Sequence, residues 1–98
     1  MNITAVRVSV KRKPENKTLA NAALTIDGEL VITGLQVVSG AKGVFVSMPQ
    51  YRDSNGEYHD RVYVLTKKTK ELISDLILTE YEKQKNNVAT HDGSDSDY

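Results

Sequence analysis

The sequence predicts a single α+β domain, an antiparallel β-meander of four to five strands followed by one C-terminal helix. Two observations support this prediction. Apolar and polar residues alternate through much of the first two thirds of the chain, and apolar residues then recur at helical spacing. The length of 98 residues is enough for one domain, which we place at residues 1–85.

Five segments have the composition and the alternation of strands. In the first of them, Val6, Val8 and Val10 share one side. The segment 44–48 is almost continuously apolar, which is typical of a central strand. The strands are expected, in chain order, at residues 2–11, 18–27, 29–39, 44–48 and, more weakly, 57–65.

Turn signals separate these strands. Residues 12–17 are polar and contain Pro14, which cannot donate to a central ladder, so they are expected to form a loop. The dipeptide Asp27-Gly28 predicts a tight hairpin, because both residues tolerate positive φ. The alternation changes phase at Thr33-Gly34, which predicts a β-bulge.

The helix is expected over residues 67–85, with Thr66 as its N-cap. Glu80 falls inside its apolar arc, so it either reaches solvent or pairs with a basic residue of the sheet or of a second subunit. Leu78 is expected to point away from the arc. The arc itself carries Leu72, Ile73, Leu76, Ile77 and Tyr81.

The two ends of the chain differ in charge. Residues 1–85 carry thirteen basic and ten acidic residues, a net charge of +3, whereas residues 86–98 carry −3. Those last residues lack periodicity and are expected to form a disordered acidic tail. The strands are apolar in both phases, and a chain this short buries little surface alone. We therefore expect a homodimer formed through the β-structure, by face packing or by sheet extension at an edge.

Composition argues against several classes of protein. Cysteine is absent, which excludes a disulfide scaffold and a cysteine-ligated zinc site. No window is apolar enough to span a membrane and no apolar signal segment opens the chain, so a cytoplasmic protein is expected. The pair His59-Asp60 is not a triad, and no phosphate-binding loop or metal motif is present. We expect no enzyme activity, catalytic residue, cofactor, metal or small-molecule substrate.

The most informative basic cluster lies at the start of the helix. Lys67, Lys68 and Lys70 occupy the first turn, where the helix dipole disfavours cations unless an anion binds. Free N–H groups, the dipole and three ammonium groups together form a phosphate site. A solvated charged face is an equally good interpretation, and both stay open.

Two weaker clusters lie elsewhere in the chain. Arg12 and Lys13 flank the first turn, where a solvated loop is the simpler interpretation. Tyr51 precedes Arg52 in a polar segment, and an arginine beside an aromatic ring can bind phosphate and stack on a base.

Several segments together resemble the stage V sporulation protein G family, the bacterial septation regulators. The resemblance covers residues 1–83 and keeps the spacing between segments. The segments that carry it are Val44-Phe45-Val46-Ser47-Met48-Pro49, then Arg52, Gly56-Glu57-Tyr58 and Asp60, and finally Leu78-Thr79-Glu80-Tyr81.

This resemblance implies a small α+β domain that dimerises through its β-structure, binds DNA and in some members RNA, and has no catalytic activity. Such proteins regulate septation, sporulation or gene expression. Where the family has two adjacent basic residues after Met-Pro, only Arg52 remains here, and Tyr51 replaces the other. Arg61 is expected to restore part of the local charge.

The first hypothesis is therefore a dimeric nucleic-acid-binding regulator. The alternative hypothesis is a protein-interaction module of the cell-division or transcription machinery, in which nucleic-acid binding is incidental; the modest charge of +3 favours this alternative. No membrane is expected among the partners. The residues expected to contact nucleic acid are Arg52, Lys67, Lys68, Lys70, Arg12, Lys13, Tyr51 and Arg61.

Overall fold

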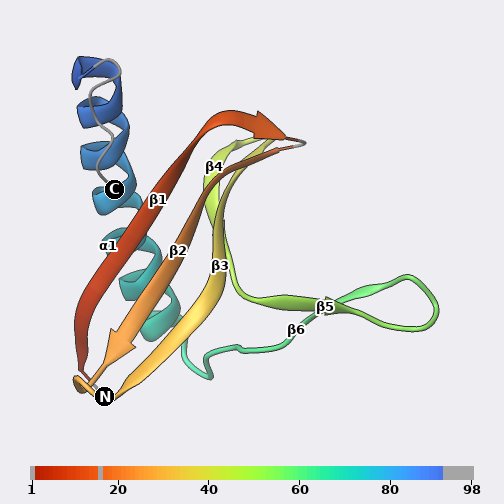
Figure 1. Cartoon of the computed structure of the whole chain (residues 1–98). Coiled ribbons are helices and arrows are strands. Elements are labelled where there is room, and N and C mark those ends of the chain that lie inside the picture. Colours follow the sequence, from red (N-terminus) through yellow and green to blue (C-terminus); the bar gives the residue numbers. More distant parts are fainter. Residues whose placement is uncertain (1, 16, 92–98) are drawn as a thin grey trace.

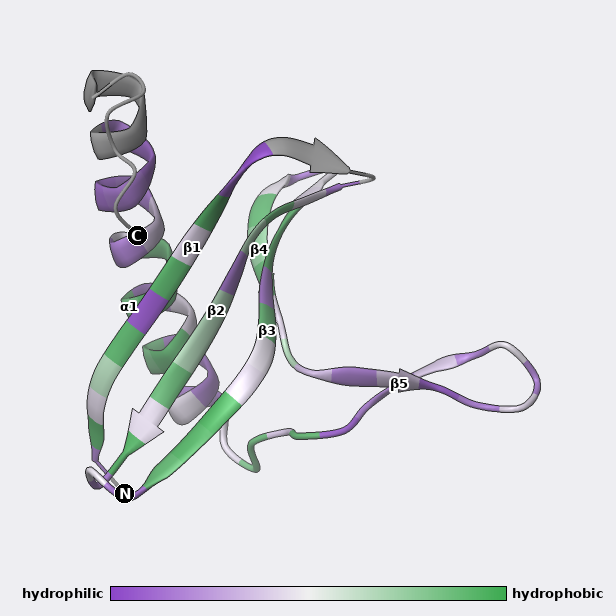
Figure 2. Ribbon diagram, in the orientation of Figure 1, coloured by the Kyte–Doolittle hydropathy of each residue, from purple (hydrophilic) through white to green (hydrophobic). Residues whose placement is uncertain are grey.

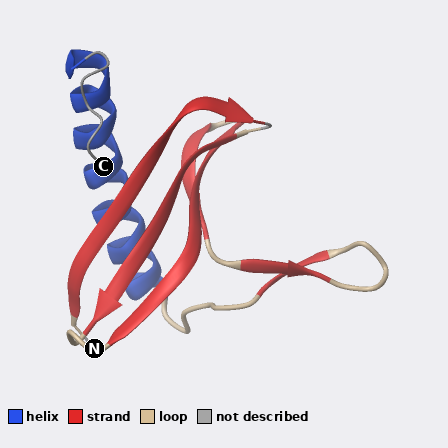
Figure 3. Cartoon of the chain, viewed as in Figure 1, coloured by secondary structure: helices blue, strands red, loops and turns tan. Residues whose placement is uncertain are grey.

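A four-stranded antiparallel sheet and one helix packed across a face of that sheet form the body of the molecule (Figure 1; Figure 3). The computed structural model describes residues 2–15 and 17–91. This architecture confirms the expected α+β class. The elements are β1 (Ile3–Glu15), β2 (Thr18–Ile26), β3 (Leu30–Gly40), β4 (Gly43–Ser47), β5 (Gln50–Arg52), β6 (Tyr58–Asp60) and α1 (Lys67–His91).

The four long strands form a meander in the order β1-β2-β3-β4. The β2–β3 hairpin turns at Asp27 and Gly28, whose φ angles are 53° and 66°. Positive φ at both central residues is the type I′ geometry that matches strand twist, so the predicted hairpin is confirmed. Asp27 also anchors the start of the chain, because its N–H donates to Asn2 O at 2.7 Å and its Oδ1 accepts from Asn2 N at 3.0 Å.

β3 contains the predicted bulge. Ala22 pairs with Leu35 whereas Leu24 pairs with Ile32, so two residues of β3 oppose one residue of β2 between these pairs. Gly34 lies in this bulge with φ of 89°, a conformation that residues with a Cβ rarely adopt. The bulge corrects the phase of β3, and as a result Leu35 enters the core.

The core lies between one face of the sheet and α1. Figure 2 shows apolar residues concentrated on the sheet and on the middle of the helix, whereas the β5–β6 segment is largely hydrophilic. Leu24, Leu35, Val37 and Ile77 fill its centre with side chains that are almost fully buried. The buried core residues are Val8, Ala20, Ala22, Leu24, Leu35, Val37, Ile73, Ile77 and Tyr81.

α1 contacts the sheet along a different stripe from the one predicted. Ile73, Ile77 and Tyr81 are buried, as expected, but Leu72 is 49% exposed. Leu78, expected to point away, is partly buried and packs against the core. The helix contacts the sheet through the i, i+4 row Ile73, Ile77 and Tyr81 and through the adjacent Leu78. This contact stripe is narrower than the predicted apolar arc and is rotated about the helix axis relative to it.

The two edge strands of the sheet, β1 and β4, differ from what was expected. β1 continues through the predicted loop of residues 12–17 as far as Glu15. Pro14 is tolerated there because β1 is an outer strand, where a missing N–H costs no ladder hydrogen bond. β4 was expected at the centre but forms the other edge, and its Val44 and Phe45 are 43% and 48% exposed.

The last strand and the helix also have different bounds from those predicted. Of residues 57–65, only β6 is a strand, and it pairs with β5 in a separate two-stranded sheet. α1 continues to His91 instead of ending at residue 85, because no Gly or Pro interrupts residues 86–91 and an established helix propagates easily. The rest of the predicted tail, residues 92–98, lies outside the described residues. No helix in the described part of the chain is long and apolar enough to cross a membrane.

Candidate nucleic-acid interface

A two-stranded arm, which we define as residues 50–60, projects away from the sheet (Figure 1). β5 and β6 form its two sides. At its base, the N–H of Arg61 donates to Pro49 O at 2.6 Å and thereby closes the arm. The arm carries no residue of the buried core, so its side chains are available for contacts outside the domain.

The tip of the arm is held by the carboxylate of Asp53. Its Oδ1 accepts hydrogen bonds from the N–H groups of Asn55 at 2.8 Å and Glu57 at 2.9 Å. Its Oδ2 lies 2.7 Å from Nε2 of His59 on β6. These contacts, led by the Glu57 N–H and then the His59 ring, lower the pKa of Asp53 below its usual value of 3.8. The negative form of Asp53 therefore organises the turn.

The lowered pKa of Asp53 predicts a pH-dependent arm. A carboxyl group whose pKa is lower in the folded state contributes stability that is present above its unfolded pKa, about 3.8, and is lost as pH falls below that value. We expect the amide resonances of Asn55 and Glu57 to keep their hydrogen-bonded shifts at neutral pH and to lose them in acid. An NMR titration checks this, with Asp53→Asn as the control that removes the transition. Shifts that stay constant through this range would contradict the role assigned to Asp53.

The arm presents aromatic and cationic side chains on both of its faces. On one face, the rings of Tyr51 and His59 stack with centroids 5.4 Å apart, and the guanidinium of Arg61 lies 5.4 Å from the Tyr51 ring. On the other face, Arg52 lies 5.7 Å from the ring of Tyr58. Register pairing explains this division, because Tyr51 faces His59 and Arg52 faces Tyr58 across the two strands.

The helix start holds the second group of predicted residues. Thr66 is the N-cap, as expected, because its Oγ1 accepts a hydrogen bond from the Thr69 N–H at 3.2 Å. No acidic residue lies in the first turn of α1. Lys67, Lys68 and Lys70 are exposed, and Lys67 Nζ lies 4.0 Å from the carboxylate of Glu71 in a surface ion pair.

The structure does not gather all the predicted residues in one place. The arm and the helix start are joined by the short segment 62–66, so five residues separate Arg61 from Lys67. Arg12 and Lys13 lie instead near the end of β1, at the opposite end of the molecule from the start of α1 (Figure 1). The side chain of Lys13 lies outside the part of the structure that is described.

Sequence reasoning missed Tyr58 and His59 as members of this surface. Tyr58 is 66% exposed, more than Tyr51 at 42%, and it is therefore the more accessible ring. The signal was the Asn55-Gly56 turn, which places Tyr58 opposite Arg52 once the hairpin register is known. Side-chain atoms of Asp53, Glu57 and His59 also lie within 4.8 Å of one another and could hold a cation, but the turn and ring contacts already occupy the Asp53 oxygens.

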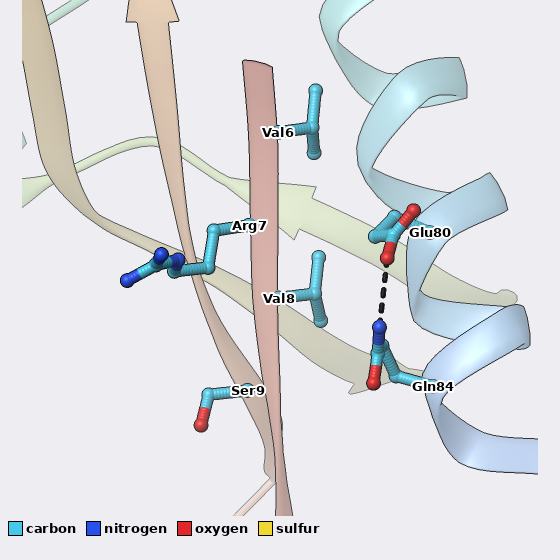
Figure 4. A pocket seen from close by; sticks show the side chains of 6 residues that line it. All are labelled: Val6, Arg7, Val8, Ser9, Glu80 and Gln84. Atoms are coloured by element: carbon cyan, nitrogen blue, oxygen red, sulfur yellow. Dashed lines mark hydrogen bonds between the residues drawn. The ribbon is translucent and has the colours of Figure 1, made fainter. Parts of the chain in front are cut away.

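A separate depression lies between β1 and α1 (Figure 4). Val6 and Val8 point toward the helix, and Arg7 and Ser9 point away from it. Glu80 faces this space half-buried and accepts a hydrogen bond from Gln84 Nε2 at 2.8 Å. Glu80 was expected either to reach solvent or to pair with a basic residue. Within the described residues it forms no ion pair, and its hydrogen-bond partner is the amide of Gln84, one turn along the helix.

Comparison with known proteins points to one family throughout. The family model described as SpoVG matches residues 1–83. A candidate septation protein SpoVG of Lachnospira eligens is 40% identical over 83 residues, which cover 85% of this chain and 93% of that protein. Proteins with the same description from Clostridium acetobutylicum and Clostridium kluyveri are 38% identical over 90 residues and 40% identical over 86 residues. These alignments cover 92% and 88% of this chain and 94% and 88% of the two relatives.

Proposed function

This chain belongs to the SpoVG family, and from that premise we propose that it is a homodimeric regulator of septation or sporulation that binds DNA, and RNA as a second ligand. The names of its relatives support the link to septation. The observation that carries the nucleic-acid part is the arm, which places Arg52 and Arg61 beside exposed tyrosine rings outside the packed core. The proposal includes no catalytic step and no cofactor.

The arm has the chemistry that a nucleic-acid strand requires. A guanidinium binds phosphate in a bidentate manner, and an aromatic ring offers a face to a base. One face of the arm carries Arg52 with Tyr58, and the other carries Arg61 with Tyr51. The arm can therefore contact two segments of one nucleic-acid backbone, or enter the groove between two backbones.

The helix start supports the same proposal through charge. Three lysines in a turn without acidic residues are unfavourable next to the positive end of the helix dipole. A bound phosphate reverses this sign, because it interacts favourably with the lysines and with the free N–H groups together. Since the chain leads from the base of the arm through residues 62–66 into this turn, the proposal assigns phosphate contacts to both groups.

An exposed edge supports the homodimer. β4 is one of the two outer strands of the sheet, and edge strands with exposed apolar side chains are templates for pairing with another chain. Pairing of two β4 edges would extend the sheet across the dimer and would present the arm twice. Each dimer would then double the number of phosphate contacts.

A charge at the edge tests this dimer. Val44→Lys places an ammonium group on β4 and is expected to shift the protein from dimer to monomer in sedimentation equilibrium, because a lysine on an edge strand opposes pairing. Leu65→Lys is the matched control, since Leu65 is 91% exposed and lies outside the sheet, so this variant remains dimeric. A Val44→Lys protein that stays dimeric would exclude β4 as the interface.

The arm provides the direct test of nucleic-acid binding. Replacing Arg52 and Arg61 together with glutamine is expected to weaken binding to a DNA duplex and to lower the slope of log Kobs against log salt by about two, about one for each phosphate contact. Fluorescence anisotropy at several salt concentrations measures both. A control with Lys42 and Lys83 replaced by glutamine has the same change in net charge and leaves the slope nearly unchanged. Equal slopes for the two double variants would remove the arm from the interface.

A further inference from the structure

A depression lies in the corner between the arm and the sheet. It lies on the face of the sheet opposite α1, because Gln36 pairs with Ser47 and Val38 with Phe45, on either side of the core pair Val37–Val46. The depression has a volume of about 710 Å³ and no acidic residue lines it. Its principal lining residues are Lys17, Gln36, Phe45, Ser47, Gln50 and Tyr58.

Two exposed aromatic rings enter this corner from different elements. Phe45 of β4 is 48% exposed, and Tyr58 of β6 is 66% exposed. The guanidinium of Arg52 lies over the Tyr58 ring at 5.7 Å, which places a cation at the rim. Exposed rings beside a cation are a stacking platform for planar groups that carry negative charge nearby.

Polar side chains between the rings can read the edge of a planar group. Gln36 and Gln50 each offer an amide, and Ser47 offers a hydroxyl. Gln50 Nε2 already donates one N–H to Asp60 Oδ1 at 2.9 Å, which leaves its carbonyl oxygen and its second N–H for a ligand. Lys17 supplies the cation among the lining residues.

We propose that this corner binds an unpaired base of a single-stranded nucleic acid, with the base stacked on Tyr58 and the adjacent phosphate on Lys17. The inference rests on the proposed function and gives it a substrate class. A base in a duplex has both faces covered by its neighbours, so only an unstacked base can use Tyr58 in this way. Lys17 in the lining, Arg52 over the Tyr58 ring and the lack of acidic lining residues favour a polyanion over a peptide or an apolar ligand.

The test compares a single strand with its own duplex. A fluorescein-labelled DNA strand of mixed sequence, and the duplex of this strand with its complement, are titrated with the protein at fixed salt. Tyr58→Leu is expected to weaken single-strand binding about tenfold, the usual loss of one base–ring stack, and to weaken duplex binding much less, because the bases of a duplex are already stacked on one another. Tyr58→Phe keeps the ring and retains wild-type affinity. Tyr63→Leu is the matched control, because Tyr63 is 67% exposed and does not line the corner.

A second measurement locates the base. A strand with 5-bromodeoxyuridine, irradiated in the complex, is expected to cross-link within the peptide that contains Tyr58 or the one that contains Phe45. Lys17→Gln should lower the single-strand salt slope by about 0.7, the value for one phosphate contact.

The outcomes separate the two proposals. Salt-dependent duplex binding together with single-strand binding that Tyr58→Leu does not weaken would overturn the corner alone. Equal weakening of duplex and single strand by Tyr58→Leu would also overturn it, since stacking on an unpaired base would not be the cause. Wild-type protein that binds neither nucleic acid would overturn the corner and the proposed function together.

Discussion

Replacing Leu35 with alanine is expected to lower the free energy of unfolding by about 3 kcal/mol, within the range for buried leucines. Leu35 has no exposed surface. It lies on β3, where it pairs with the buried Ala22 of β2 and belongs to the same core as Val37. The substitution removes apolar burial and leaves a cavity that the bulged strand and α1 can only partly fill. A domain of this size has a total stability of about 5–15 kcal/mol, so this loss is a large fraction of it.

Urea denaturation followed by circular dichroism measures this loss. Leu30→Ala is the matched control, because Leu30 is on the same strand and is 58% exposed. Its expected effect is within about 0.5 kcal/mol of zero. Equal losses in the two variants would contradict the core derived from the structure. If pairing at β4 also contributes to stability, the midpoint will depend on protein concentration in both variants alike.

Replacing Lys67, Lys68 and Lys70 together with glutamine is expected to have the largest effect on nucleic-acid binding. Each lysine that contacts a phosphate contributes about one unit to the salt slope for duplex DNA, so the triple variant should lose about three. The fold should remain intact, because the three side chains are exposed and Thr66 still caps the helix. Removal of like charges near the helix dipole should even raise thermal stability slightly.

A charge-matched control distinguishes contact from general attraction. Lys42, Lys83 and Lys85 lie outside the first helical turn, and their joint replacement by glutamine gives the same net charge. If the slope falls by the same amount in both triple variants, the helix start has no special role. If the first variant alone loses slope and gains stability, the solvated-face interpretation of these lysines is wrong.

Local signals in the sequence were sufficient where a structure depends on a few neighbouring residues. The Asp27-Gly28 hairpin, the bulge at Gly34 and the Thr66 cap were all predicted correctly, because each depends on backbone angles or hydrogen bonds within a short segment. The family was identified from several such segments whose spacing is kept over residues 1–83.

Features that depend on distant neighbours were not predictable in the same way. The apolar run of β4 suggested a central strand, but its exposure depends on strand order, which its own residues do not encode. Pro14 suggested a loop, yet β1 is an edge strand and tolerates it. Leu72 and Leu78 exchanged roles because the angle at which α1 crosses the sheet selects which part of its apolar arc is buried.

Within the candidate site, residues with local signals were likewise predicted, and those that depend on distant neighbours were not. Arg52 was identified from its neighbour Tyr51 and from the family resemblance, and Arg61 from its charge. The structure places Arg52 beside Tyr58 and Arg61 beside Tyr51. Tyr58 was missed because its role depends on the hairpin register that pairs it with Arg52. Arg12 lies near the end of β1, at the opposite end of the molecule from the start of α1, and its inclusion depended on charge alone.

The most direct test of the central claim is the binding of wild-type protein to a random-sequence DNA duplex by fluorescence anisotropy at several salt concentrations, repeated with single-stranded RNA. We expect binding to both, with log Kobs falling linearly as log salt rises and a slope that reflects several phosphate contacts. Failure to bind either nucleic acid at low salt, or binding that does not change with salt, would exclude nucleic-acid binding through these basic residues. A search for a protein partner in the division or transcription machinery would then follow.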